Sequence, residues 1–189
     1  MIENRIRLFE TDYTINGKHA TRLKFLAKKN ARDDPEPDNP NAAKIFERYI
    51  DVYMNAAVWG IRYRRKAKTE PSGDRARIYA DAFIRERENC IFLYRLVMLL
   101  DDSENLTQTE RIDRAFRCDT LPDKNDDLKK NLELFHDYVR GGIDLMFEKF
   151  TDGCQSREDY LEKTFALMTE FKAELDGIDY SAELDKLMK

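Results

Sequence analysis

Residues that interrupt helices are scarce in this sequence. Its 189 residues include seven glycines and five prolines, whereas charged residues make up 37%, well above the quarter that is usual for a folded domain. Many charges with few helix breakers favour long amphipathic helices. Nine tyrosines and eleven phenylalanines exclude a disordered chain and provide for the core of a single domain.

Cysteine is equally rare. Cys90, Cys118 and Cys154 are far apart and form no C-x-x-C pair, which argues against a disulfide framework or a zinc site. Reduced thiols in a cytoplasmic protein are the natural interpretation, with Cys90 in the core. The longest apolar run, Cys90–Leu100, contains Arg95 and is too short to span a bilayer, which needs about 20 residues. Met1–Glu10 lacks the apolar stretch of a signal peptide, so we expect no membrane segment.

Residue patterns that carry catalysis are also missing. The chain has two histidines and neither a glycine-rich phosphate loop nor a G-x-S-x-G motif. Glu133-x-x-His136 resembles one half of a di-iron site, but such sites need the pair twice and His19 lacks the pattern. The acidic pairs that begin at Asp101 and Asp126 fall at predicted helix ends, where capping explains them. We therefore predict no enzyme, no cofactor and no metal.

Apolar residues at three- and four-residue spacing predict a series of helices. Their ranges are Lys18–Ala31, Asn41–Lys68, Arg75–Leu100, Thr107–Cys118, Asp126–Phe150 and Ser156–Leu175. Thr107-x-x-Glu110 is a capping box. The predicted fold is an all-α bundle of five to six helices, with a short extended N-terminal arm (1–16), a helical core (17–153) and a C-terminal helical appendage (154–189).

Two local patterns leave alternatives open, and a third predicts which helix lies at the centre of the core. Arg5–Phe9 alternates charged and apolar residues, as a strand or an extended arm would. Because nothing obvious in the chain pairs with it, a strand here would take its partner from another protomer. The second half of the predicted 75–100 helix is apolar nearly all round, which places it at the centre of the core. Gly141-Gly142 inside a helix indicates either a kink or a close backbone contact.

Charge is divided unevenly along the chain. Residues 1–77 hold 17 Lys and Arg against 11 Asp and Glu, a net of +6, and the remainder carries −10. One interpretation of the basic cluster Arg62–Arg77 is a solvated helix end, where cations complement the helix dipole. The functional interpretation is one phosphate-tracking surface built from three basic segments. Its predicted nucleic-acid-binding residues are Arg5, Arg7, Lys18, Arg22, Lys24, Lys28, Lys29, Arg62, Arg64, Arg65, Lys66, Lys68, Arg75 and Arg77.

Two segments resemble the DndE subunit of bacterial DNA phosphorothioation systems. Asn4-Arg-Ile-Arg-Leu8, with Arg22-Leu-Lys24 after it, is similar to that family's opening arm and first helix. Phe135-His136-x-x-x-Arg140-Gly141 is similar to its closing helix. The resemblance implies a small helical, DNA-associated accessory protein of a modification or phage-defence system, with self-association as a further expectation.

Two hypotheses for function follow. The first is a non-catalytic DNA-associated accessory subunit. The alternative is a helical protein–protein interaction subunit that docks on a larger enzyme without touching DNA, because a basic N-terminal part and an acidic remainder can each attract a partner. Trp59 lies on an apolar stripe, so it is expected in the core rather than as a platform for base stacking.

Overall fold

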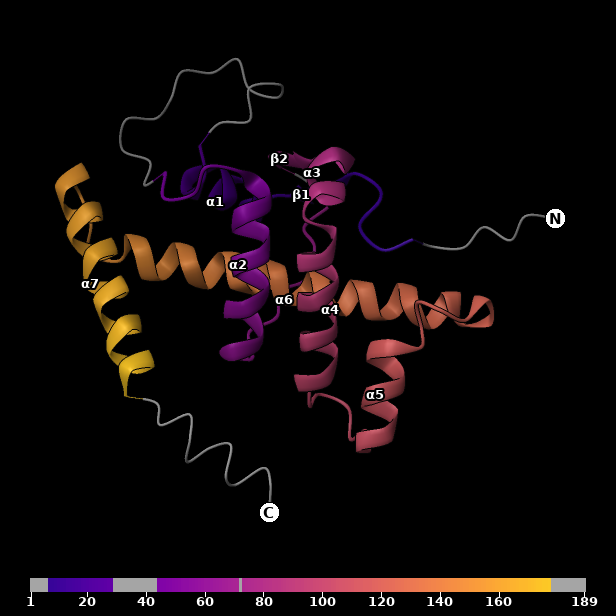
Figure 1. Ribbon diagram of the computed structural model, residues 1–189. Coiled ribbons are helices and arrows are strands. Elements are labelled where there is room, and N and C mark those ends of the chain that lie inside the picture. The colour runs from indigo at the N-terminus through magenta and orange to yellow at the C-terminus, as the bar shows by residue number, and fades with distance from the viewer. Residues whose placement is uncertain (1–6, 29–43, 72, 178–189) are drawn as a thin grey trace.

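A single long helix, α6 (Asn125–Thr151), forms the axis of the protein (Figure 1). The computed structural model describes residues 7–28, 44–71 and 73–177. Within α6 every residue from Phe135 to Met146 is buried, so this stretch has no face toward solvent. Helices α2 (Tyr49–Arg62) and α4 (Arg87–Leu100) cross it steeply in Figure 1.

The other elements surround this axis. They are β1 (Tyr13–Asn16), α1 (Lys18–Leu26), β2 (Arg75–Ile78), α3 (Ala80–Arg85), α5 (Gln108–Phe116), the 3-10 turn η1 (Pro122–Lys124) and α7 (Arg157–Asp176). The described residues thus contain seven α-helices and one two-stranded sheet. The mostly helical class is confirmed. The prediction of five to six helices was too low, because one predicted helix is divided.

The capping box predicted for α5 is present. The backbone N–H of Glu110 donates to Thr107 Oγ1 at 3.3 Å, and the backbone N–H of Thr107 donates to Glu110 Oε2 at 2.7 Å. These reciprocal bonds satisfy two backbone donors that the first turn of a helix leaves free. The predicted helices at 126–150 and 156–175 match α6 and α7 within two residues.

The predicted helix over Arg75–Leu100 was wrong in its first part. Arg75–Ile78 is strand β2, in which Ala76 and Ile78 are buried and the two arginines are exposed. This period of two is the pattern of a half-buried strand. It pairs antiparallel with β1, with Tyr13 opposite Ile78. The described N-terminal strand is at Tyr13–Asn16 and has its partner in the same chain, whereas residues 7–9 of the predicted segment form no strand and residues 5 and 6 lie outside the described residues.

The second predicted helix was too long at both ends. Its predicted residues 41–43 lie outside the described residues, as do residues 29–31 of the predicted Lys18–Ala31 helix. That first helix was also predicted too long, because α1 ends at Leu26 and Ala27 has extended backbone. Helix α2 begins after Arg48, whose backbone N–H donates to Asp51 Oδ2 at 3.0 Å. It ends at Arg62, and Arg64 has a positive φ of 52°, which a continuing right-handed helix does not allow.

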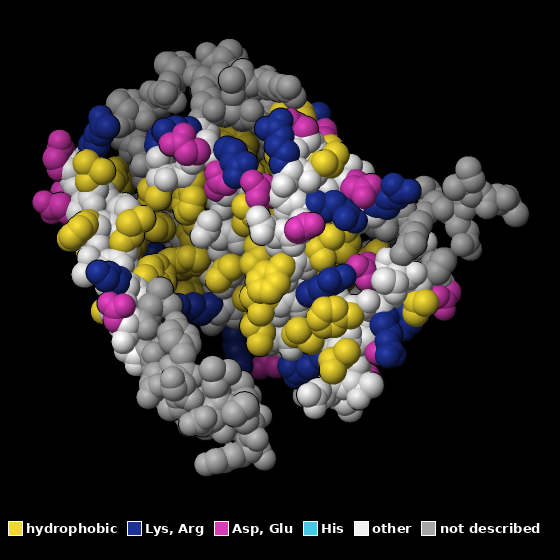
Figure 2. Space-filling model, viewed as in Figure 1, with side chains coloured by type: hydrophobic (Ala, Val, Ile, Leu, Met, Phe, Trp, Pro, Cys, Tyr) yellow, Lys and Arg dark blue, Asp and Glu magenta, His cyan; other side chains and the backbone are white. Residues whose placement is uncertain are grey.

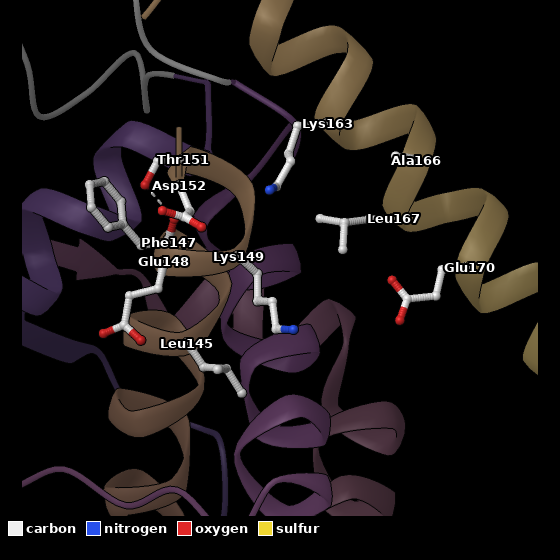
Figure 3. A pocket seen from close by; sticks show the side chains of 10 residues that line it. All are labelled: Leu145, Phe147, Glu148, Lys149, Thr151, Asp152, Lys163, Ala166, Leu167 and Glu170. Carbon is white, nitrogen blue, oxygen red and sulfur yellow. Dashed lines mark hydrogen bonds between the residues drawn. The ribbon is translucent and has the colours of Figure 1, made fainter. Parts of the chain in front are cut away.

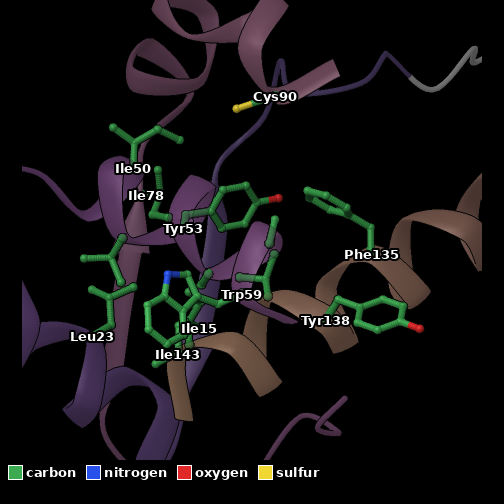
Figure 4. Close-up of a cluster of buried hydrophobic side chains, with 14 of the residues drawn as sticks. Ile15, Leu23, Ile50, Tyr53, Trp59, Ile78, Cys90, Phe135, Tyr138 and Ile143 are labelled. Atoms are coloured by element: carbon green, nitrogen blue, oxygen red, sulfur yellow. The ribbon is translucent and has the colours of Figure 1, made fainter. Parts of the chain in front are cut away.

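The centre of the core is α6 and not the 90–100 segment. Helix α4 buries one face, with Tyr94 and Met98 inside, whereas Phe92 and Leu100 are exposed. Figure 4 shows Phe135, Tyr138 and Ile143 of α6 among the buried side chains. Tyr53 of α2 contacts the ring of Phe135 edge-on, with the centroids 5.8 Å apart. Trp59 is buried against Phe171 of α7, as expected of a core residue.

Small residues set the crossing of α2 over α6. A Cβ added at Gly142 would overlap the carbonyl oxygen of Ala56, and one added at Gly60 would overlap that of Tyr138. A third, at Gly141, would overlap the carbonyl oxygen of Arg65. Of the two alternatives for the glycine pair, the close backbone contact is therefore present.

We expect Gly142→Ala to lower the free energy of unfolding by about 2–3 kcal/mol, because the new methyl group meets backbone that cannot rotate away. In an uncrowded helix the same substitution would stabilise by about 1 kcal/mol. Urea unfolding followed by circular dichroism measures the difference. Lys130→Ala, an exposed position on the same helix, is the control and should change stability by less than about 0.5 kcal/mol. A Gly142→Ala variant as stable as the wild type would contradict the proposed crossing.

Candidate functional site

The predicted basic segment that follows α2 runs across α6. We call residues Arg64–Lys68, which follow α2, the basic strap. The backbone N–H of Ala67 donates to the carbonyl oxygen of Asp137 at 2.9 Å, and Arg140 Nε donates to the carbonyl oxygen of Ala67 at 2.9 Å. The strap is thus bonded to α6 through its own backbone.

The charged side chains of the strap are all ion-paired. Arg65 makes a two-pronged pair with Glu148, with both N···O distances 2.6 Å, which is the strongest geometry for arginine and a carboxylate. Three further pairs complete the set, namely Arg64 with Asp102, Lys66 with Asp101, and Lys68 with Asp137.

The cations of α1 are paired in the same way. Arg22 Nη1 lies 2.7 Å from Asp144 Oδ1, and Lys24 Nζ lies 2.6 Å from Asp74 Oδ1. Other predicted residues pair as Lys18 with Glu70, Lys28 with Glu47, Arg62 with Glu174, Arg77 with Asp12 and Arg7 with Glu10.

The structure therefore brings some of the predicted residues together, but against carboxylates of the same chain. Lys18, Arg22 and Arg65 converge on Asp144 and Glu148. Among the predicted cations that the structure describes, Arg75 alone forms no ion pair. Arg5 and Lys29 lie outside the described residues. A cation that is already paired with a carboxylate attracts phosphate less strongly than a free one. This arrangement therefore does not favour the DNA-binding prediction, which stays a prediction.

Asp144 is the hub of a buried polar cluster. The Nδ1 of His19 lies 2.8 Å from its carboxylate, and His19 Nε2 lies 3.2 Å from the carbonyl oxygen of Lys68. Burial alone would raise the pKa of Asp144, but the hydrogen bonds from His19 and Arg22 outweigh it and hold the pKa below its usual value. The cluster joins α1, the strap and α6.

Arg140 is the hub of a second cluster. It is buried, and its guanidinium contacts Asp137 at 2.5 Å, Glu133 at 2.6 Å and the Tyr13 hydroxyl at 2.9 Å. The carboxylate of Glu133 is therefore ion-paired with Arg140. No group of three or more potential metal ligands is found in the part of the chain that the structure describes.

A third cluster lies around Asp101, at the end of α4. This carboxylate is fully buried and accepts hydrogen bonds from the hydroxyls of Tyr138 at 2.6 Å and Ser103 at 2.9 Å. Arg114 of α5 approaches it at 3.2 Å. Burial would raise the pKa of Asp101, but these partners together lower it. The cluster fixes α5 to α4 and α6.

His136 lies in an aromatic environment. Its ring stacks on Tyr13 with a centroid distance of 3.8 Å, and its Nε2 lies 3.1 Å from the Tyr53 hydroxyl. Burial, with a smaller contribution from Arg140, lowers the pKa of His136 to about 3. A cavity of about 510 Å³, lined in part by Phe9 and Phe83, adjoins it.

Among the described residues, two groups of exposed apolar side chains lie on neighbouring positions of helices. The first, which we call the α4–α5 surface, consists of Phe92, Arg95, Ile112 and Phe116. Phe92 is 65% exposed, and the Arg95 guanidinium lies 5.1 Å from the centre of the Phe116 ring. Figure 2 shows apolar side chains interspersed with basic ones over these two helices.

The second surface is the outer face of α7. Leu161, Phe165 and Met168 recur at helical spacing and are all exposed, Phe165 by 75%. The opposite face of α7 packs on the body through Phe171 and Leu167. Helix α7 is therefore apolar on two faces. Between α6 and α7 lies a cleft of about 600 Å³, into which Lys149 and Lys163 project from the two helices (Figure 3).

Comparisons with known proteins identify no family. No family model matches the chain, no curated protein is similar to it at a significant level, and no solved structure matches its fold. The resemblance to DndE thus has no support beyond the quoted residues. Phe135, His136, Arg140 and Gly141, which carry half of it, are all buried in the core, and the resemblance stays a prediction.

Among the described helices, none is both long and apolar enough to cross a membrane.

Sequence reasoning missed the two apolar surfaces. Phe92 was assigned to a central helix, although its position opposite Tyr94 and Cys90 on the helix already distinguished two faces. The outer stripe of α7 was read together with its inner one, since both show the same spacing.

We expect stability to fall between pH 7 and pH 5 because of His136. Its pKa is about 3 in the folded protein and 6.5 when exposed, so the unfolded chain takes up a proton that the folded chain excludes. This contribution is present above pH 6.5 and is lost as the pH falls toward 3, by about 2 kcal/mol between pH 7 and 5. Urea unfolding at both pH values measures it.

In His136→Gln this loss should disappear, whatever the variant's stability at pH 7. The carboxylates with lowered pKa values have ordinary values of 3.8 for Asp and 4.5 for Glu, so they lose most of their contribution below pH 5, and they are the same in both proteins. His19 is present in both proteins, so the difference in slope isolates His136. Lys130→Gln is the control and should keep the wild-type slope. An equal pH dependence in His136→Gln and wild type would show that His136 is not excluded from protonation.

Proposed function

We propose that this protein is a non-catalytic helical subunit that docks on a larger protein partner through the α4–α5 surface, without direct contact with DNA. The observation that carries the proposal is the exposure of Phe92 and Phe116 beside Arg95 on two helices fixed to the body. Protein interfaces are enriched in aromatic residues and arginine, and a few such side chains supply most of the binding energy.

The two helices that carry the α4–α5 surface are hydrogen-bonded to each other, which suits a docking role. Arg111 Nη1 donates to the carbonyl oxygen of Leu99 at 3.3 Å, and Arg114 Nη2 donates to that of Met98 at 2.6 Å. These bonds tie α5 to α4, so the exposed rings do not have to be ordered when a partner binds, which lowers the entropic cost of association.

The ion pairing of the basic segments also favours the hypothesis of a protein partner over that of DNA association. DNA binding by this chain would require breaking pairs such as Arg65 with Glu148 before a phosphate could replace the carboxylate. Burying the exposed rings of Phe92 and Phe116 against a partner requires no such exchange, because neither ring forms an ion pair.

The test combines a pull-down with a DNA-binding assay at about 0.15 M salt. Tagged wild-type protein should retain one larger protein from the source cells, and the affinity of the purified pair can then be measured. Phe92→Ser with Phe116→Ser should weaken that affinity at least about tenfold. Circular dichroism checks that the variant folds, as substitutions at exposed positions should allow.

Lys130→Gln is the matched control and should bind the partner as the wild type does. Duplex DNA should give no saturable binding at this salt concentration. Partner binding that survives the double substitution would reject the surface. Saturable DNA binding that weakens in Arg75→Glu would instead favour the DNA-associated role.

A further inference from the structure

The outer face of α7 has charged residues of opposite sign at equal distances on either side of an apolar centre. Glu158, Leu161, Phe165, Met168 and Lys172 lie along one face of the helix and are all exposed. We call these five residues the α7 stripe. Phe165 lies midway, seven residues from Glu158 and seven from Lys172. The stripe is thus acidic at one end, apolar in the middle and basic at the other end.

We propose that the α7 stripe is a homodimer interface, in which α7 of a second copy packs antiparallel across Phe165. A two-fold interface places the same surface on both subunits and therefore requires that the surface be complementary to itself. Antiparallel pairing about Phe165 brings Glu158 of one copy to Lys172 of the other, twice. It also places Leu161 against Met168 of the second copy.

The charges at the ends of the stripe are available for this pairing. Neither Glu158 nor Lys172 forms an ion pair with any residue in the described ranges, although most cations of α1 and of the strap are paired within the chain. A parallel arrangement would set like charges opposite each other, so the charge pattern selects the antiparallel orientation.

The inner face of α7 holds the stripe in place. Phe171 packs edge-on against Trp59 with a centroid distance of 5.2 Å, and Tyr160 packs against Phe25 at 5.6 Å. Arg62 of α2 pairs with Glu174 at 2.6 Å. The stripe is therefore presented by a helix that is already fixed, and little order is lost on association. A single helix pair is a small interface, so the expected dissociation constant is micromolar.

Sedimentation velocity over a range of protein concentrations tests the proposal. The wild type should show a monomer–dimer equilibrium in the micromolar range. Phe165→Asp should raise the dissociation constant at least about tenfold, because it places two carboxylates at the centre of the interface. Wild-type protein that stays monomeric throughout, or a dimer that Phe165→Asp leaves unchanged, would overturn the proposal.

A charge exchange tests the orientation. Glu158→Lys and Lys172→Glu should each weaken the dimer, about tenfold at low salt, and the double variant should restore it. An equimolar mixture of the two single variants should also associate, since each supplies the charges the other needs. Lys163→Glu, the same charge change on the cleft side of α7, is the control and should have no effect. Failure of the double variant to recover would reject antiparallel pairing.

Discussion

A helix enclosed by protein along its middle cannot leave a polar side chain without a partner, and this constraint on α6 organises the molecule. Between Phe135 and Met146 the helix carries Asp137, Arg140 and Asp144, all buried. Burying an unpaired charge is far more costly than burying a paired one. Each of these side chains is therefore met by another segment, namely α1, β1 or the basic strap. The result ties together parts of the chain that are more than 100 residues apart, such as His19 and Asp144.

The same constraint explains why most cations of the basic segments that the structure describes are ion-paired within the molecule. The net charge of residues 1–77 is balanced locally by carboxylates of α6, the end of α4 and α7. The uneven distribution of charge along a sequence indicates how much electrostatic attraction is available. It does not indicate whether that attraction acts within the molecule or between molecules. Here Arg65, Lys66 and Lys68 use it within the molecule.

The elements that the sequence predicted well are those whose signal is local. The capping box at Thr107 and the long apolar periodicity of α6 can be recognised from neighbouring residues. Strand β2 was missed because its four residues precede a helix without a breaker, and its partner Tyr13–Asn16 lies far away. Whether each cation is ion-paired depends on contacts between segments that are far apart in the chain. A single sequence does not show these contacts. Phe92 fell in a segment predicted as the centre of the core, and the exposure of Phe165 was not predicted, because apolar spacing identifies a helix face without showing what covers it.

The two apolar surfaces lie on different parts of the molecule, because α4 crosses α6 and carries α5 beside it, whereas α7 lies at the C-terminal end of α6 (Figure 1). Helix α5 leads into its N-terminal end and α7 follows its C-terminal end (Figure 1), and 27 helical residues span about 40 Å. A dimer joined through α7 would leave both α4–α5 surfaces open, since neither takes part in the contact. Such a dimer could hold two copies of a partner, or two sites on one partner, and a second contact within the same complex strengthens binding without any new interaction. Self-association through α7 and docking through α4 and α5 are therefore compatible, and each can be removed without the other.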